Sequence, residues 1–332
     1  MREDKQIQLR NKSVFAPYFS DFVAQKRALG NRYDTCVEVL NLFDDFCIQH
    51  EVREAAISDT LFQEWCQRRT TENGTTQKIR VAYTQMFSKF LHDNGIEAPA
   101  SFHPLPKQEK AFIPYIFSTD EIRRLIDTID GQNSTPCPGA PARHLVQPVL
   151  FRVLYGCGLR VNEALKLKKD DADLENGTLL IREAKGGRDR IVVMSDGLTD
   201  ICRTYRSNHI MQSYESEYFF PNRDHGYYDA STIYADFRKY LLLSGIPHRG
   251  RGKGPRLHDV RHSFSVHVLS TWVRQGKDLY TCLPILQTYL GHTRLSATEK
   301  YLRLVPEAFT QVTEAFESEF GTVFPEVRHE EK

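Results

Sequence analysis

Residues 257–264 read LHDVRHSF and place His258 three positions before Arg261. An earlier stretch, residues 154–165, reads LYGCGLRVNEAL and contains Arg160. Arginine has a planar guanidinium that binds two oxygens at once and stays charged at any working pH. Two arginines supported by imidazoles can therefore stabilise the negative charge that builds up on a phosphate under attack, which is usually the largest contribution to catalysis.

A candidate nucleophile follows these basic stretches. Residues 290–294 read LGHTR and contain His292, and Tyr301 comes nine positions after that histidine. An unperturbed phenol has a pKa of about 10, so a nucleophilic tyrosine needs a nearby base or a strong cationic field. The chain holds 15 tyrosines, so one tyrosine alone is weak evidence. Tyr289 is the nearest rival, but its place before the LGHTR stretch predicts that it packs in a helix.

A β-hairpin is predicted between the two arginine boxes. Residues 179–181 and 191–194 are short apolar β-formers, and the stretch AKGGRDR joins them. Its paired glycines mark a turn. The turn carries Lys185 and Arg188, and a lysine there can reach into a DNA groove. An isolated lysine would be read as a solvated loop charge, whereas its company with the other basic boxes favours a catalytic role.

These stretches, in this order and spacing, resemble the catalytic domain of the tyrosine recombinases, the phage integrase family, from about residue 114 to 305. The resemblance implies a site-specific DNA recombinase. It assigns Tyr301 the attack on a phosphate, Lys185 the protonation of the leaving 5′ oxygen, and Glu163 a supporting place beside the basic cluster. His258 would take the tyrosine proton or stabilise the phosphate. The implied catalytic set is Arg160, Lys185, His258, Arg261, His292 and Tyr301.

The same resemblance implies a course for the reaction. Four protomers would hold two double-stranded DNA recombination sites and exchange strands through 3′-phosphotyrosyl links and a four-way junction. The covalent link conserves the phosphodiester energy, so neither a nucleotide cofactor nor a divalent metal is expected. Residues 255–304 look most like transposon-borne integrases, and accessory or partner recombinases are compatible with this assignment.

Other interpretations stay open at this level. The chain could be a catalytically silent DNA-binding accessory of a multi-recombinase element, although an intact set of six residues argues against lost chemistry. It could also be a type IB topoisomerase-like nicking-closing enzyme, because the same site relaxes DNA when no partner strand is exchanged. His258 and His262 are four positions apart, as in helical zinc motifs. Asp259 stands where those metalloproteases need glutamate, so His262 is expected to be a structural neighbour.

The charge distribution favours a DNA-binding enzyme more than the net charge of +1 suggests. Residues 106–305 carry 29 basic and 22 acidic side chains, whereas residues 306–332 carry 2 and 7, so an acidic tail masks a basic region. Basic side chains that neutralise phosphates give salt-sensitive affinity. The glycine-rich run at 248–256 suits close approach to a DNA backbone. The candidate phosphate contacts are Arg249, Arg251, Lys253 and Arg256, with Arg188 in the hairpin.

Cysteine and hydropathy patterns bear on the compartment. The seven cysteines are scattered, with no Cys-x-x-Cys pair, and therefore indicate neither a disulfide framework nor a zinc ribbon. The sequence shows no signal peptide and no apolar run long enough to cross a bilayer. We therefore expect a cytoplasmic protein.

The expected fold class is mainly α with a small antiparallel β-sheet near residues 173–194. Amphipathic helices are predicted at 13–29, 58–70 and 75–93, with a further helix through 36–47 that Asp34 or Thr35 would cap. Ser118 and Glu121 have the spacing of a capping box at the start of another helix. Four prolines between 131 and 148 predict a loop.

Four segments are expected along the chain. Residues 1–105 form a helical core-binding (SAM-like) DNA-binding domain, 106–117 a proline-containing linker, 118–305 the α+β catalytic domain, and 306–332 a C-terminal helix with an acidic tail. On the fourth helix of the first domain, three basic residues either contact DNA or lie on a solvated face: Lys78, Arg80 and Lys89.

The tail has an apolar stripe at helical spacing, made by Phe309, Val312, Phe316 and Phe320. The stripe either packs on its own domain or, as the family resemblance implies, is exchanged between protomers.

Overall fold

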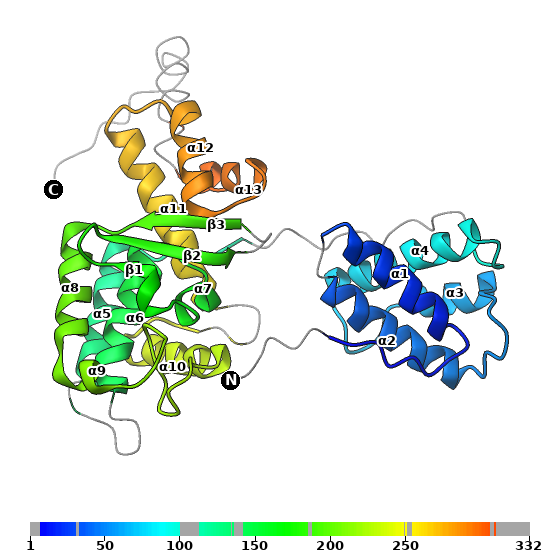
Figure 1. The fold of residues 1–332 in the computed structure, drawn as a ribbon. Helices are drawn as coiled ribbons and strands as arrows, with labels where there is room; N and C mark the ends of the chain where they lie inside the picture. Colours follow the sequence, from blue (N-terminus) through cyan, green and yellow to red (C-terminus); the bar gives the residue numbers. More distant parts are fainter. Residues whose placement is uncertain are drawn as a thin grey trace, which may run out of the picture. The chain divides into compact units, whose positions relative to one another are not determined.

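The computed structural model describes residues 7–30, 33–99, 113–133, 135, 142–184, 188–248, 250, 254–305 and 309. Internal contacts divide the chain into two units, residues 1–112 and 113–332. Figure 1 draws the first unit in blue to cyan and the second in green to orange.

The N-terminal unit is a bundle of four helices around an aromatic core. The Phe87 ring lies at its centre, with its centroid 4.7 Å from that of Phe19 and 5.6 Å from that of Phe22. The side chains of Ser58 and Asn73 cap two of the helices. The helices confirm the four predicted ones, and they are α1 (Ala16–Ala28), α2 (Asp34–Gln49), α3 (Asp59–Cys66) and α4 (Gly74–Asp93).

Arg80 on α4 is buried, so the prediction that it contacts DNA or lies on a solvated helix face is wrong. Its residue is 2% exposed, and its Nε donates to the Glu72 carboxylate at 3.1 Å. Its guanidinium carbon lies 4.7 Å from the centroid of the Trp65 ring. Lys89 on the same helix is half exposed and pairs with Asp93 at 3.0 Å. Arg80 and Lys89 therefore differ in burial because of tertiary packing. The spacing of charges along the helix does not reveal this difference.

The C-terminal unit is mainly helical and contains a three-stranded antiparallel sheet in the order β1-β2-β3. The strands are β1 (Ala172–Asp173), β2 (Thr178–Ala184) and β3 (Arg188–Val193). The expected mainly α fold with a small antiparallel sheet is thereby confirmed. The helices are α5 (Thr119–Gln132), α6 (Arg143–Gly156), α7 (Val161–Leu165), η1 (Lys169–Asp171), α8 (Asp196–Ser207), α9 (His209–Ser213), α10 (Ala230–Leu243), α11 (Leu257–Arg274), α12 (Leu279–Leu290), α13 (Ser296–Glu299) and η2 (Leu302–Leu304).

Helix boundaries were predicted well where capping chemistry is local. The capping box of Ser118 and Glu121 is formed at the start of α5. Two other expectations are wrong. Tyr33, with a φ of 58°, precedes α2, which has no side-chain cap. The loop predicted for 131–148 is shorter at its C-terminal end, because α6 begins at Arg143 and includes Pro148. Proline removes one helical hydrogen bond, and the buried apolar side chains of α6 offset that loss.

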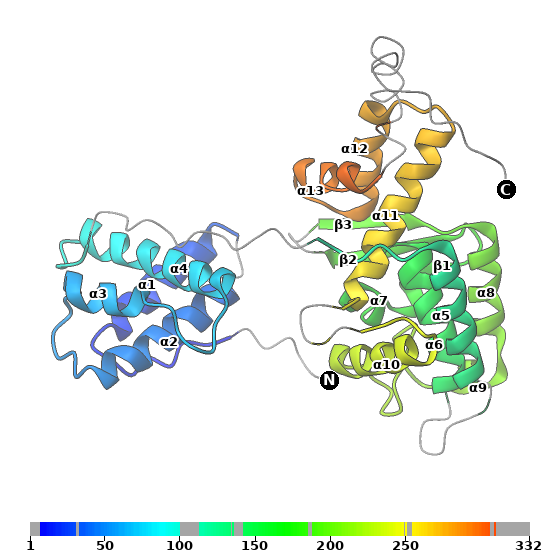
Figure 2. The same cartoon turned by 180° about the vertical axis from the view of Figure 1, so that it is seen from behind.

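Helix α11 joins the two apolar clusters of this unit. Leu257 and Val260 at its start belong to the main cluster with α5, α6 and α10. Val266 and Leu269, further along, belong to a second cluster with α12 and η2. Figures 1 and 2 show α11 running from the helical layer past the sheet to α12 and α13. The polar side chains of α11 that lie between the two clusters therefore sit where the unit's two parts meet.

Within the described ranges, no helix combines the length and the apolarity that crossing a bilayer requires.

Candidate active site

Arg261 on α11 is the buried centre of the site. It is 1% exposed, and its guanidinium donates to the carbonyl oxygens of Gly158 at 2.7 Å and Leu290 at 2.6 Å. Burial lowers its pKa to about 10, and the charge of Arg160 acts in the same direction. The group therefore remains a cation at neutral pH. It ties the turn before α7 and the end of α12 to α11.

Gly158 permits this arrangement. Its φ is +56°, and a Cβ added there would lie 2.4 Å from Cδ1 of Phe264. A side chain at this position would be strained by its backbone conformation and would clash with the ring. Glycine therefore lets the turn approach α11 closely enough for the Gly158 carbonyl to accept from Arg261.

Glu163 is shared by three arginines. Its carboxylate lies 2.6 Å from Arg160, 2.8 Å from Arg190 and 3.7 Å from Arg261. Burial raises the pKa of Glu163, but the hydrogen bonds and charges of Arg190 and Arg160 outweigh it and lower the pKa to about 2. One carboxylate thus faces three cations, and the cluster has a surplus of positive charge. Arg160, whose side chain is 22% exposed, is the most accessible of the three.

Arg190 is a member of this cluster that the sequence analysis did not single out. Its Nε donates to the Tyr289 carbonyl at 2.9 Å, and its side chain is 7% exposed. The residue lies on β3, two positions before the fully buried Val192. Because side chains alternate across a strand, Arg190 shares the inward face of that valine. This alternation was the available signal for a buried functional charge.

His292 lies directly after α12 and contacts the arginines. Its Nε2 is 3.2 Å from Nη2 of Arg261, and its Nδ1 is 2.9 Å from the hydroxyl of Thr298. Burial lowers its pKa to about 4, and the charges of Arg261 and Arg160 add to the effect. The imidazole is therefore neutral at neutral pH in the protein as it stands, and it can hydrogen bond to an oxyanion through whichever nitrogen carries the proton.

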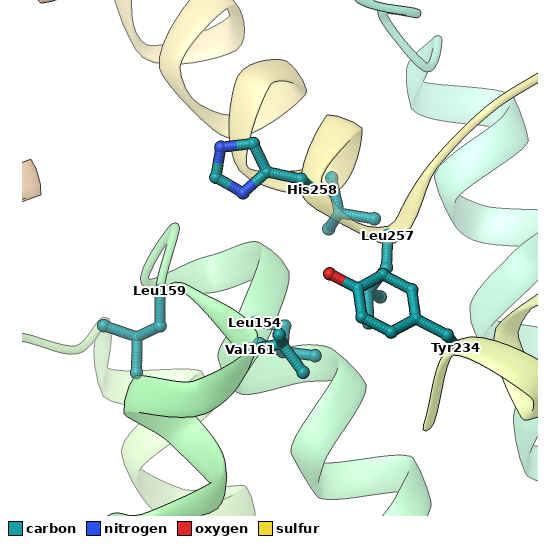
Figure 3. Close-up of a pocket in the computed structure, with 7 residues that line it drawn as sticks. Leu154, Leu159, Val161, Tyr234, Leu257 and His258 are labelled. Carbon is teal, nitrogen blue, oxygen red and sulfur yellow. The ribbon is translucent and has the colours of Figure 1, made fainter. Parts of the chain in front are cut away.

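His258 lines a small pocket at the start of α11. The pocket walls are otherwise mostly apolar, and Figure 3 shows the Tyr234 hydroxyl pointing into the space between His258 and Leu154. Burial lowers the pKa of His258 to about 3, and His262 and Arg261 contribute in the same sense. The His258 ring meets the His262 ring edge-on, with a centroid distance of 4.7 Å. The remaining lining residues are Leu159, Val161, Leu257 and Val260.

Tyr301 is held within the same cluster. Only 4% of the residue is exposed, and its hydroxyl lies 3.0 Å from Nδ1 of His262. Its ring lies nearly parallel to that of His292, with a centroid distance of 6.2 Å and an interplanar angle of 25°. Burial raises the pKa of the phenol, whereas the nearby charges of Arg261 and Arg160 lower it. The contact with His262 is the one that the sequence analysis missed, because it treated that histidine as a structural neighbour.

Tyr289, the rival tyrosine, is engaged elsewhere. Its hydroxyl donates to the Val193 carbonyl at 2.9 Å, and its ring stacks on Phe264. Burial raises its pKa far above the ordinary value. The residue lies on α12, as the sequence predicted, and connects that helix to β3.

Some predicted residues cannot be placed. Four of them lie outside the described residues: Lys185, Arg249, Arg251 and Lys253. Arg188 is described as part of β3 in its backbone only. Arg256 is described fully; its Nη2 donates to the buried Asp259 at 2.9 Å, while 42% of its side chain is exposed. The structure thus gathers Arg160, Glu163, His258, Arg261, His292 and Tyr301 in one cluster.

A metal site does not emerge from the described part of the chain. No group of three histidine, cysteine, aspartate or glutamate side chains there has the geometry to hold an ion. His262 faces Tyr301, and Asp259 accepts from Arg256. Of the two histidines one turn apart on α11, His262 thus contacts the phenol and His258 meets the ring of His262.

Comparison with known proteins identifies the family of this chain. The family model described as "Phage integrase family" matches residues 116–307. A Sinorhizobium fredii protein named as an integrase/recombinase, y4rB, is 29% identical over 316 residues, which cover 92% of this chain and 98% of that protein. Tyrosine recombinase XerA of Thermococcus kodakarensis is 27% identical over 246 residues, or 73% and 77% of the two chains.

The fold also matches a solved structure. The crystal structure of XerH site-specific recombinase, bound to palindromic difH substrate in a post-cleavage complex, aligns with a TM-score of 0.62. The alignment covers 86% of this chain and 79% of that one, at 18% identity. The likeness at this identity concerns the fold, whereas the family model spans more than half of the chain. The chain therefore belongs to the phage integrase family, that is, to the tyrosine recombinases.

Proposed function

We propose that this protein cuts and rejoins double-stranded DNA at specific sites, with Tyr301 as the nucleophile. The observation that carries the proposal is the position of the Tyr301 ring, whose centroid lies 6.2 Å from that of His292, while His292 contacts the buried Arg261. Arg160 adds a partly exposed guanidinium to the same cluster. A scissile phosphate bound to these cations would lie near the phenol, because the ring of His292, which contacts Arg261, is next to that of Tyr301.

The chemistry follows from the charges. The Tyr301 oxygen attacks phosphorus, the bond to the 5′ oxygen breaks, and a 3′-phosphotyrosyl link and a 5′ hydroxyl result. Arg160 and Arg261 neutralise the charge that develops on the non-bridging oxygens. Lys185 donates the proton that the 5′ oxygen needs. Attack by the 5′ hydroxyl of a partner duplex reverses the step and exchanges the strands through a four-way junction, so the link itself carries the required energy.

The remaining parts of the chain have proposed roles in DNA binding and assembly. Each of the four cut strands needs its own tyrosine, so the proposed assembly has four protomers on two sites. Residues 1–105 bind DNA as a separate domain joined by a linker at 106–117 to the catalytic domain at 118–305, and the tail at 306–332 docks on a neighbouring protomer. The proposed phosphate contacts are Arg188, Arg249, Arg251, Lys253 and Arg256.

The test uses duplex DNA from the flanks of the gene's own element, nicked near the crossover so that cleavage releases a short fragment and traps the intermediate. We expect a covalent adduct on the 3′ phosphate with the wild-type protein and none with Tyr301→Phe. Tyr289→Phe is the matched control, because it removes a hydrogen-bonded tyrosine hydroxyl in the same unit and should still form adduct. An adduct that survives in Tyr301→Phe would refute the proposed nucleophile.

A further inference from the structure

His262 makes a contact that the proposed reaction does not yet use. It lies one turn after His258 on α11, and its Nδ1 is 3.0 Å from the Tyr301 hydroxyl. Hydrogen bonds from Ser265 and Arg261 also stabilise the phenolate form of Tyr301. A neutral serine and a cationic guanidinium are poor proton acceptors, whereas an imidazole nitrogen is a good one.

We propose that His262 is the general base that takes the proton of Tyr301 as the phenol attacks, which leaves His258 to act at the phosphate. The assignment rests on the proposed function, because it concerns the same nucleophile. The sequence analysis considered two roles for His258, acceptance of the tyrosine proton and stabilisation of the phosphate, and this assignment gives them to two different histidines. The geometry favours this division, since Nδ1 of His262 lies 3.0 Å from the Tyr301 hydroxyl, whereas His258 meets the ring of His262 and lies within the field of Arg261 and Arg160.

The protonation state of His262 suits this role. Burial lowers its pKa to about 4; Asp259 raises it, and the charges of Arg256 and Arg261 lower it. Its imidazole is therefore neutral at neutral pH, and the tautomer with the proton on Nε2 presents a lone pair at Nδ1 to the phenol. A bound phosphate adds negative charge nearby and raises the basicity of His262 when the proton must be accepted.

The proposed step balances. As the bond from Tyr301 Oη to phosphorus forms, the Oη proton moves to Nδ1 of His262. The bond between phosphorus and the 5′ oxygen breaks, and its electron pair leaves with that oxygen. Lys185 supplies the proton that the 5′ oxygen then takes up. In the resealing step, Lys185 accepts the proton of the attacking 5′ hydroxyl, and the His262 imidazolium returns its proton to Tyr301 Oη. Both groups end in their starting states.

Two variants separate a base from a mere hydrogen-bond partner. In His262→Asn the amide lies near the position of Nδ1 and can hold the phenol, but it cannot accept a proton; His262→Ala removes both functions. The matched control is His267→Asn, because His267 lies on the same helix and its Nδ1 contacts the Tyr155 hydroxyl at 2.8 Å. All three variants are compared with the wild type at equal DNA occupancy, which binding titrations establish.

The measurement is single-turnover adduct formation on the nicked duplex, with either an ordinary phosphate or a sulfur atom at the bridging 5′ position. A thiolate leaves without protonation, so the sulfur substrate bypasses defects at the leaving group. We expect both His262 variants to be slower by about 10²–10⁴-fold on both substrates, and His267→Asn to match the wild type.

Three outcomes would overturn the assignment while the proposed function stands. They are a wild-type rate in His262→Asn, rescue of both His262 variants by the sulfur substrate, and a wild-type rate in His262→Ala. The first outcome would make His262 a positioning residue, and the second would place it at the leaving group. Absence of adduct with the wild-type protein, or its persistence in Tyr301→Phe, would instead remove the proposed function and this inference together.

Discussion

Each unit of this protein buries an arginine against a glutamate, and the two pairs differ in their charge balance. In the N-terminal unit, Arg80 donates to both carboxylate oxygens of Glu72 and to the carbonyls of Trp65 and Gln67. Its side chain and that of Glu72 are 3% and 7% exposed. The donors of this guanidinium are thus directed at protein acceptors, and the pair has no evident capacity for a further anion.

The C-terminal unit surrounds one glutamate with three arginines. Glu163 balances one of the charges of Arg160, Arg190 and Arg261, and two remain. The cluster also meets neutral imidazoles and a phenol instead of further carboxylates. Since unpaired buried charge is costly, such a surplus indicates a site built to receive an anion. The comparison teaches that the ratio of cations to carboxylates, and not burial alone, distinguishes this structural ion pair from the cluster that we propose binds phosphate.

The largest expected effect comes from breaking the balanced pair. Arg80→Met leaves the Glu72 carboxylate buried without its partner, which costs about 3–5 kcal/mol of stability. The measurement is the free energy of unfolding by urea, followed by Trp65 fluorescence in a Trp272→Phe background, because the chain has two tryptophans. The double variant Arg80→Met/Glu72→Gln should recover much of the loss. A loss below about 1 kcal/mol in the single variant would contradict a structural role for this pair.

A substitution in the cluster of Glu163 and its three arginines should slow the reaction more than it destabilises the fold. Arg261→Lys keeps a positive charge but loses the planar fork that donates to Gly158 and Leu290 and that we propose binds the scissile phosphate. We expect single-turnover adduct formation to fall about 10²–10³-fold, as for loss of one donor to an oxyanion. DNA affinity should change little, because it depends on many phosphate contacts. A rate within threefold of the wild type would argue that Arg261 only supports the fold.

The pH dependence of stability offers a third comparison. The folded pKa of Glu163 is about 2, below that of an ordinary carboxyl, so its stabilisation is present above the unfolded pKa and is lost as the pH falls toward 2. We expect the difference in unfolding free energy between the wild type and Glu163→Gln to shrink by about 2 kcal/mol between pH 5 and pH 2.5. A constant difference across this range would show that Glu163 is not the carboxylate that holds the cluster.

The smallest effect is expected at Lys89, which lies on α4 like Arg80 but on its exposed side. The Lys89–Asp93 pair has both side chains about half exposed, and such pairs contribute about 0.3–0.5 kcal/mol. Lys89→Gln should therefore leave the urea midpoint of the Trp65 transition almost unchanged. A loss above about 1 kcal/mol would mean that burial is not what separates the two basic residues of this helix.

Sequence patterns predicted the parts of this protein that local chemistry decides. The four helices of the first unit follow from apolar periodicity, and the start of α5 follows from its capping box. The order of the arginine, histidine and tyrosine boxes indicated the family, because each box carries its own residue types and spacing. Pro148 shows the limit of this reasoning, since packing of α6 prevails over the local signal to break the helix.

Contacts between distant residues required the tertiary structure. Arg190 lies 27 positions from Glu163, and His262 lies 39 positions from Tyr301; no local pattern indicates either distance. The residue types and their order already indicated by themselves the tyrosine recombinase family, to which the chain belongs. Only the packing of α11 against α12 and of α12 against β3, with Arg261 of α11 reaching Glu163 of α7, decided which imidazole faces the phenol and which arginines share the glutamate. These pairings depend on how separate elements pack against one another. Helical or strand periodicity predicts only which residues of a single element share a face.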